Sequence, residues 1–363
     1  MTSPALPSFE GLLAREDVIW MGQNTTHLQP APEVLQALEE STRRHEFQVY
    51  APSAGFAELR QLIVEDLGLP GFDSWVLDGA VAGLNHLCMT LAPRISKLIT
   101  SDPGWPWPGR FVSIAGVPVT TLPVYEQPRR LLSAAQIAEV IEPRSLIYLI
   151  DPLNPLGSSY SPTEIAAIVE LARDSESYLI HDATYRHFAD THTLAATLYP
   201  ERTFTTYSFS KWLGLAGLRV GAIVAAPELL ADVMAVPANP LGAGIQAQRA
   251  AIAGLHVRER WLRTLRATNR RNLDAIEQTV SESGFGTIVV PRSQGNFLAI
   301  DLTGSDWNSD ALCDRILDQA NIFIRPGTYQ SPMFGTRFVK VSTSVPPDWV
   351  DQFCAVWKAY APR

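Results

Sequence analysis

The sequence predicts an α/β protein with a large domain, built on a mostly parallel sheet flanked by helices, and a smaller α+β domain at the C-terminal end. Between about residues 74 and 225, short β-like runs alternate with helical stretches, the order expected of a parallel sheet covered by helices. A long helical stretch rich in Ala, Arg and Leu follows at about 244–283, and three further strand candidates come after it. A chain of 363 residues is long enough for one large core and a second, smaller one.

The strand candidates of the large domain are short, and most of them are apolar throughout. A central strand of a parallel sheet is covered by helices on both sides, so both of its faces should be apolar. The candidates lie at residues 75–77, 97–100, 146–150, 178–180, 204–207 and 220–225.

One helix start between these strands is clear. Ser161 can act as the N-cap, Pro162 suits the first helical position, and Glu164 completes a capping box. The apolar residues Ile165 and Ile168 follow at helical spacing. We therefore expect a helix that begins at Pro162.

The smaller domain has strand candidates at residues 296–302, 322–325 and 338–342, and a helix is expected at about 310–319. We expect residues 1–44 to form an N-terminal arm that packs with this domain. Residues 45–240 would then form the large, cofactor-binding domain. Residues 241–363 would form the linking helix and the small domain.

Composition excludes several kinds of partner. The formal net charge is −8 without any block rich in lysine or arginine, which argues against nucleic acid or an acidic membrane surface. The most apolar stretch, residues 220–236, contains Pro227, Glu228 and Asp232, so we expect no membrane span. The first residues lack a basic segment followed by a long apolar run, so no signal peptide is expected.

The three cysteines, Cys88, Cys313 and Cys354, are widely spaced and form no CxxC pair. An odd number of separated cysteines is typical of reduced thiols and not of a disulfide framework or a zinc site. We therefore expect a cytoplasmic protein without a bound metal.

The most informative residue is Lys211, which directly follows a predicted strand. Ser208 and Ser210 precede it, and Arg219 follows eight positions later. A lysine that binds an aldehyde cofactor covalently needs a crowded amine that loses its proton readily, and a nearby cation can hold a cofactor phosphate. Alone, the pattern S-x-S-K is short and occurs by chance, so an ordinary surface lysine is the simpler interpretation.

Two upstream segments also follow predicted strands. Asn154 lies in D-P-L-N-P-L-G, where an ordinary loop is the simpler interpretation. Asp182 and Tyr185 lie in H-D-A-T-Y, where the carboxylate could simply begin a loop. The alternative is functional, because open α/β sheets bind ligands at the carboxyl ends of their strands. There, Asp182 could pair with a protonated pyridine nitrogen, and Tyr185 could reach a ring hydroxyl beside Asn154.

These three segments occur together, in one order, and the chain from about Gln23 to its C-terminus resembles the class I/II aminotransferases of pyridoxal-phosphate (PLP) fold type I. The resemblance implies a homodimeric, PLP-dependent transferase of amino-acid metabolism that moves an amino group between an amino acid and a 2-oxo acid. It implies that Lys211 holds PLP and moves the substrate Cα proton. It also implies that Asn154 and Tyr185 contact the ring oxygen and that Asp182 contacts the ring nitrogen.

The same resemblance assigns further cofactor contacts. Ser208 and Arg219 would bind the phosphate, together with main-chain N–H groups at Gly79 and Ala80. Family members usually carry a hydroxyl or amide side chain at this turn, and here there is none. Two aromatic residues complete this set: Trp105 would stack on the ring, and Tyr50 would reach into the neighbouring subunit's site.

The match departs from the family on the last predicted strand. Family members carry an arginine there that binds the substrate carboxylate, whereas this chain has Lys340. Lysine supplies charge without the planar fork of arginine, so the exchange is not conservative. Arg325 and Arg337 lie close in sequence as possible substitutes. The departure keeps an alternative open: a PLP-dependent decarboxylase, lyase, cyclase or oxidase that acts on an amino acid.

Two short segments resemble the histidinol-phosphate aminotransferase branch: Gly295-Asn296-Phe297, and Gln23-Asn24 in the N-terminal substrate strand. The substrate contacts implied are Asn24, Asn154 and Lys340. Asn296 can equally be a strand residue that caps a neighbouring backbone group. A third hypothesis is a non-catalytic sensor on this fold, but the chain has no room for the DNA-binding domain that such proteins carry.

Overall fold

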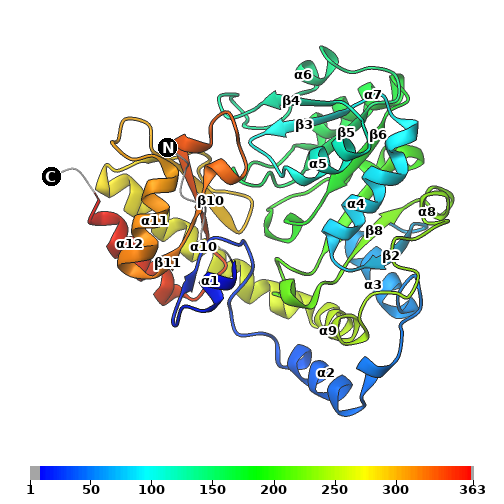
Figure 1. Ribbon diagram of the computed structural model, residues 1–363, viewed down its shortest axis with the longest axis horizontal. Helices are drawn as coiled ribbons and strands as arrows, with labels where there is room; N and C mark the ends of the chain where they lie inside the picture. Colours follow the sequence, from blue (N-terminus) through cyan, green and yellow to red (C-terminus); the bar gives the residue numbers. More distant parts are fainter. Residues whose placement is uncertain (1–8, 361–363) are drawn as a thin grey trace.

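The computed structural model describes residues 9–360, which form one large sheet and one small sheet with helices around them (Figure 1). The strands of the large sheet are β2 (Asp73–Leu77), β3 (Leu98–Asp102), β4 (Val119–Pro123), β5 (Leu146–Ile150), β6 (Tyr178–Asp182), β7 (Thr203–Ser208) and β8 (Gly221–Ala225). Their order across the sheet is β2-β8-β7-β6-β5-β3-β4.

The large sheet is mostly parallel, as predicted. Strands β3 to β7 pair in parallel, and only β8 runs antiparallel to both of its neighbours. All residues of β5, β7 and β8 are buried, which explains the apolar sequences of β5 (L-I-Y-L-I) and β8 (G-A-I-V-A). The sequence analysis missed β4, because this edge strand (V-T-T-L-P) is partly exposed and lacks an apolar run.

Helices cover the large sheet. They include α4 (Ala80–Leu91), which contacts β7 and β8, α5 (Trp107–Ile114), α6 (Ala134–Ala138), α7 (Pro162–Asp174) and α8 (Pro227–Val233). The predicted start of α7 is confirmed: the Ser161 hydroxyl accepts the Glu164 N–H at 3.3 Å, and the Glu164 carboxylate accepts the Ser161 N–H at 2.8 Å.

The single long helix expected at about 244–283 is wrong. The structure has two helices, α9 (Ile245–His256) and α10 (Arg258–Ser283), which meet at Val257. They pack on different partners: α9 contacts α2 (Pro32–Arg43) and α3 (Ala57–Leu67), whereas α10 contacts α12 (Pro347–Lys358). The helical sequence pattern is continuous, so only these separate packing surfaces reveal the break.

The small sheet has the order β12-β13-β10-β9 and is antiparallel. Its strands are β9 (Thr287–Ile288), β10 (Phe297–Asp301), β12 (Arg325–Pro326) and β13 (Phe338–Ser342), and the predicted helix is α11 (Ser309–Ala320). The single strand predicted at 322–325 is wrong. Its first part, β11 (Ile322–Phe323), pairs with β1 (Ile19–Trp20), and Arg325 begins β12, so one extended run serves two sheets.

The N-terminal segment contacts both parts of the molecule. Helix α1 (Phe9–Leu13) lies next to β1, which pairs with β11, whereas α2 contacts α9. The proposed domain limits at residues 44 and 240 remain a prediction. Within residues 9–360, no helix is both long enough and apolar enough to cross a membrane.

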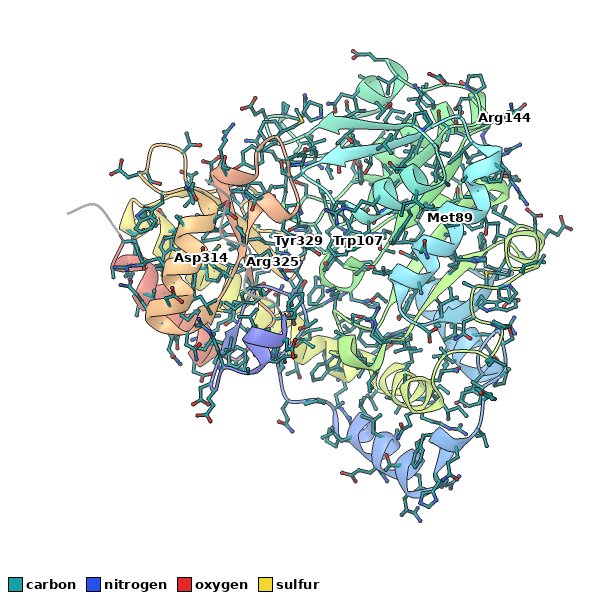
Figure 2. All side chains as sticks on the ribbon, viewed as in Figure 1. Met89, Trp107, Arg144, Asp314, Arg325 and Tyr329 are labelled. Atoms are coloured by element: carbon teal, nitrogen blue, oxygen red, sulfur yellow. The ribbon has the colours of Figure 1, made fainter. Side chains whose placement is uncertain are left out.

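The two faces of the small sheet bury different residues. Leu298, Ile300 and Val339 belong to the core of the small sheet and its helices, whereas Phe297 and Phe338 belong to the large core. Side chains alternate along a strand, so Lys340 lies on the same face as Phe338 and points toward the large domain. Figure 2 shows Arg325 and Tyr329 near this boundary, where the guanidinium lies 4.6 Å from the Tyr329 ring.

Candidate active site

A cavity of about 290 Å³ lies between the large and the small sheet. Strands β5, β6 and β7 are parallel, so their carboxyl ends meet at one edge, and Asn154, Asp182 and Ser208 arrive there together. The predicted site residues that line the cavity are Asn24, Ala80, Trp105, Asn154, Asp182, Tyr185, Ser208, Lys211, Arg219 and Lys340.

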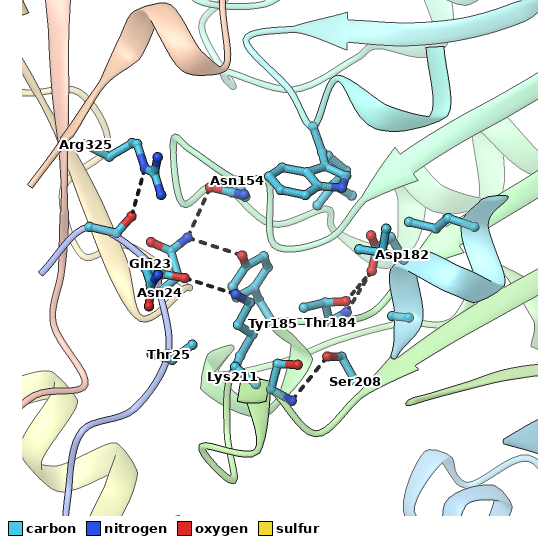
Figure 3. Close-up of a pocket in the computed structure, with 18 of the residues that line it drawn as sticks. Gln23, Asn24, Thr25, Asn154, Asp182, Thr184, Tyr185, Ser208, Lys211 and Arg325 are labelled. Atoms are coloured by element: carbon cyan, nitrogen blue, oxygen red, sulfur yellow. Dashed lines mark hydrogen bonds between the residues drawn. The ribbon is translucent and has the colours of Figure 1, made fainter. Parts of the chain in front are cut away.

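Lys211 lines the cavity, with Asn24 on one side of it and Asp182 and Ser208 on the other (Figure 3). Its Nζ donates to the backbone carbonyl of Gln23 at 3.0 Å, and it has no carboxylate partner among residues 9–360. Burial, together with the charges of Arg325 and Arg219, lowers the pKa of Lys211 to about 8. An amine with this pKa is partly neutral near physiological pH, which a nucleophile and proton acceptor requires.

Hydroxyl groups orient Asp182. One carboxylate oxygen accepts the hydroxyls of Thr184 at 2.5 Å and Thr206 at 2.7 Å, and the other accepts the hydroxyl of Tyr148 at 2.7 Å. The Thr184 N–H adds a fourth bond at 3.1 Å. The sequence analysis missed these supporting residues, because strand residues such as Tyr148 and Thr206 carry no motif.

Asn154 and Tyr185 converge on one side chain. The Asn24 amide donates both to the Asn154 side-chain oxygen and to the Tyr185 hydroxyl, each at 3.2 Å (Figure 3). Asn24 has a positive φ of 57° and is held by the small domain: its N–H donates to Ser342 at 2.8 Å, and its carbonyl accepts from Asn296 at 2.8 Å. Asn296 thus caps a backbone carbonyl, as the second interpretation expects, but it lies just before β10 and not within the strand.

One end of the cavity lies at the start of α4. Gly79, with φ 90°, provides no side-chain cap for this helix, and Ala80 and Val81 line the cavity. A Cβ at Gly79 would lie 2.5 Å from an Arg219 nitrogen, so glycine allows the guanidinium to lie against the turn. Arg219 donates only to backbone carbonyls, and Ser208 lines the same end. Free N–H groups, the helix dipole and a cation together favour an anion here.

The opposite end holds Arg325 and Lys340, which face each other across β12 and β13. Their side chains are only 7% and 4% exposed. Arg325 donates to the Gly22 carbonyl at 3.2 Å, and Lys340 donates to Asn154 at 3.4 Å. Burial, with the charges of Arg325 and Lys211, holds the pKa of Lys340 well below its usual range. Like charges directly opposite in a sheet are destabilising unless an anion lies between them.

The side chains that line the cavity carry more positive than negative charge. Four basic side chains line it (Lys211, Arg219, Arg325 and Lys340) and only one carboxylate, that of Asp182. None of the four forms an ion pair within the described part of the chain. The cavity therefore suits a ligand with anionic groups at both ends.

Not every predicted residue lines the cavity. Tyr50 is 78% exposed and lies on the surface of this chain. Arg337 pairs instead with Glu126 at 2.8 Å and Asp301 at 3.5 Å, so its suggested role as a substitute for the missing arginine is wrong. Trp105 lines the cavity 6.0 Å from the Tyr329 ring, and Phe9 and Tyr329 are aromatic lining residues that the sequence analysis missed.

Several proteins with similar sequences are named aminotransferases. An aspartate aminotransferase from Pyrococcus horikoshii is 24% identical over 349 residues, which cover 92% of this chain and 88% of the relative. An aromatic amino acid aminotransferase from Mycobacteroides abscessus is 28% identical over 353 residues, which cover 94% and 93%. Other relatives are named histidinol-phosphate aminotransferases.

The fold also matches solved structures. A crystal structure of an aminotransferase from Mycobacterium tuberculosis superimposes with a TM-score of 0.84 over 98% of this chain and 94% of that chain, at 21% identity. The sequence profile described as aminotransferase class I and II matches residues 16–356, nearly the whole chain. The chain therefore belongs to the class I and II aminotransferase family.

Proposed function

We propose that the cavity holds PLP, bound covalently through Lys211, and that the enzyme uses it to move an amino group between an amino acid and a 2-oxo acid. The observation that carries this proposal is the lining of the cavity, in which four basic side chains, the buried Lys211 among them, accompany a single carboxylate. Amino-group transfer is the activity of the family, and the sequence match favours it over decarboxylation, elimination or oxidation.

The residues at the start of α4 fit the phosphate of PLP. Arg219 supplies the charge, the turn at Gly79 leaves room for it, and the N–H groups at Ala80 and Val81 supply donors. This set replaces the hydroxyl or amide side chain that the turn lacks. Ser208 adds one hydroxyl from the end of β7.

PLP supplies an electron sink for the charge left when the substrate Cα–H bond breaks. Asp182, held by three hydroxyls, would keep the ring nitrogen protonated. Asn154 and Tyr185, which both accept from Asn24, would bind the ring oxygen. Lys211, whose lowered pKa leaves part of its amine neutral, would accept and return the substrate Cα proton. Trp105, which lines the cavity, would pack against the bound group.

We propose that Arg325 and Lys340 together bind the substrate carboxylate. Arg325 provides a permanent charge, and its ring contacts with Phe9, Phe323 and Tyr329 fix its guanidinium. Lys340 becomes more basic when an anion lies beside it, so carboxylate binding and protonation of Lys340 favour each other. Asn24, held by Ser342, completes this side.

Arg325→Met is expected to lower kcat/KM for amino acids by about 10- to 100-fold, because a hydrogen bond to a charged group contributes on the order of 1.5–3 kcal/mol. Lys340→Met should have a smaller effect than Arg325→Met. Steady-state kinetics with a panel of amino acids measures both. The matched control is Arg337→Met, which removes an arginine outside the cavity and should leave kcat/KM unchanged. Equal losses in Arg337→Met and Arg325→Met would contradict the assignment.

The pKa of Lys211 predicts how the apoprotein captures PLP. Only the neutral amine attacks the aldehyde, and the neutral fraction rises with pH until the pKa is passed. The capture rate should therefore rise about tenfold per pH unit below pH 8 and level off above about 8. Stopped-flow absorbance on mixing apoprotein with PLP measures this rate. A rise that continues to pH 10 would indicate an unperturbed lysine.

The direct test of the proposed function is absorbance with product analysis. The purified protein with PLP should show the near-visible band of a lysine-bound cofactor, and amino-acid substrates should bleach it. A new amino acid should appear in a one-to-one ratio with the 2-oxo acid consumed. Release of CO₂, ammonia or peroxide instead would favour the alternative PLP reactions. Absence of the band would exclude PLP and favour a binding protein.

We also propose that the enzyme is a cytoplasmic homodimer. Tyr50 and its neighbours Phe47 and Val49 form an exposed apolar surface, which suits a subunit contact and would let Tyr50 reach the partner's phosphate site. None of the three cysteines is paired, consistent with a reducing compartment. Light scattering should give twice the mass of the 39.9 kDa chain. A fully active monomer would contradict the role of Tyr50.

A further inference from the structure

A buried cluster of Asp151, His181 and His192 lies behind Asp182, on the opposite side of strands β5 and β6 from the cavity. Side chains alternate along a strand: Ile150 and Asp182 line the cavity, so Asp151 and His181 point away from it. The Asp151 N–H donates to the Asp182 carbonyl at 3.0 Å, so the two acidic residues occupy adjacent strand ends (Figure 1). The catalytic roles proposed above do not use this cluster.

Two hydrogen-bond donors and two histidine rings surround the Asp151 carboxylate. One oxygen accepts the Ser159 hydroxyl at 2.6 Å and the Tyr160 N–H at 3.2 Å. The other lies 3.5 Å from His181 Nε2 and 3.2 Å from His192 Nε2, which is also 3.1 Å from the Asp151 backbone carbonyl. The carboxylate thus ties together the segment after Asn154, the strand of Asp182 and the loop that carries His192.

The hydrogen bonding of His181 argues against a metal ion at these three side chains. The Ala195 N–H donates to His181 Nδ1 at 3.1 Å, so this nitrogen carries no proton. The neutral ring then holds its proton on Nε2, directed at Asp151. A metal ligand needs the lone pair of Nε2 and usually donates its other N–H to an acceptor, the reverse of this arrangement. The cluster is therefore a hydrogen-bonded one.

The cluster has one uncompensated negative charge. Burial lowers the pKa of His192 to about 4, so this ring is neutral near pH 7. Burial raises the pKa of Asp151, but His181, His192 and Ser159 together outweigh it and hold this pKa below its usual range. Arg186, whose charge acts on His192, is itself paired with Asp66 at 2.7 Å. A buried carboxylate with only neutral donors is a cost that a function can explain.

We propose that Asp151 is a positioning residue whose carboxylate supplies a second negative charge behind Asp182 and fixes the strand ends that carry Asp182 and Asn154. The inference rests on the proposed binding of PLP. A second buried negative charge on the far side of Asp182 from the cavity would favour the protonated form of a ring bound beside Asp182 more than Asp182 does alone. The Ser159 hydroxyl and the Tyr160 N–H donate to Asp151 and stabilise its ionised form without neutralising it.

The test is an absorbance titration of the PLP-loaded protein against pH. Asp151→Asn keeps the shape of the side chain and removes its charge, so the pKa of the lysine-bound cofactor band should fall by about one unit, the order expected when a buried charge near a titrating group is removed. The matched control is Ser159→Ala, which removes a neutral hydrogen bond to the same carboxylate but leaves the charge. Its band should titrate as in the unaltered protein.

The outcomes separate the two proposals. No band in the unaltered protein with PLP would refute the proposed function itself. A normal band that titrates identically in Asp151→Asn would overturn only the role of Asp151. Equal changes in Asp151→Asn and Ser159→Ala would also overturn it, because they would indicate a purely structural carboxylate. If Asp151→Asn does not fold, Asp151→Ser, which leaves space for water, allows the same comparison.

Discussion

Lys211→Ala is expected to lower kcat for amino-group transfer by on the order of 10⁴-fold, because one amine serves as both the covalent anchor and the proton carrier. The near-visible band of the loaded protein should be lost as well. Transfer is measured as new amino acid formed at saturating PLP. The matched control is Lys358→Ala, which alters an exposed lysine paired with Glu282 and should leave kcat unchanged.

A second amine in the cavity makes the Lys211 result informative in either direction. Lys340 is buried in the same cavity, and burial holds its pKa well below the usual range. A residual rate above about one hundredth of the original, which is far more than a 10⁴-fold loss would leave, would point to Lys340 as a substitute base. The double variant Lys211→Ala/Lys340→Met would then remove it. Full activity in Lys211→Ala would contradict the assignment of the catalytic lysine.

Asp182→Asn is expected to lower kcat by about 10²- to 10³-fold, because a preorganised charge at the reacting group contributes this much in other enzymes. The variant keeps the size of the side chain but no longer favours a protonated ring nitrogen. Thr206→Val, which removes one of three hydroxyl donors to the same carboxylate, should have a much smaller effect. Single-turnover bleaching of the band measures both variants.

The Asp182 result separates an electronic role from a structural one. If Asp182→Asn and Thr206→Val lose activity equally, the carboxylate mainly holds the strand ends in place. If Asp182→Asn binds PLP normally yet transfers slowly, the charge itself acts in the reaction. Normal transfer in Asp182→Asn would contradict the proposed contact with the ring nitrogen.

The sequence was sufficient for the features that depend on local pattern. Continuous apolar runs predicted β5 and β8, and the capping box at Ser161 predicted the start of α7, because these signals involve neighbouring residues. The sequence did not predict the features that depend on packing between distant segments. The helix break at Val257 and the split strand at 322–325 follow from a change of packing partner, which a local pattern does not record.

The same division holds for the site. Asn154, Asp182, Ser208 and Lys211 follow strands that the sequence predicts, and parallel strands end at one edge, so their meeting could be inferred from the sequence by itself. The sequence alone could not show which basic residue replaces the arginine that family members carry on the last strand. Arg325 and Arg337 lie 12 positions apart and both are close to Lys340 in sequence.

Only the tertiary structure distinguishes these two arginines. The pairing of β12 with β13 places Arg325 opposite Lys340 in the cavity, whereas Arg337 pairs with Glu126 and Asp301 outside it. The cluster of Asp151, His181 and His192 likewise arises from three separate segments. Motifs along the chain therefore determined the chemistry, and long-range pairing decided the charges that surround it, because electrostatic interaction depends on distance in space and not on distance in sequence.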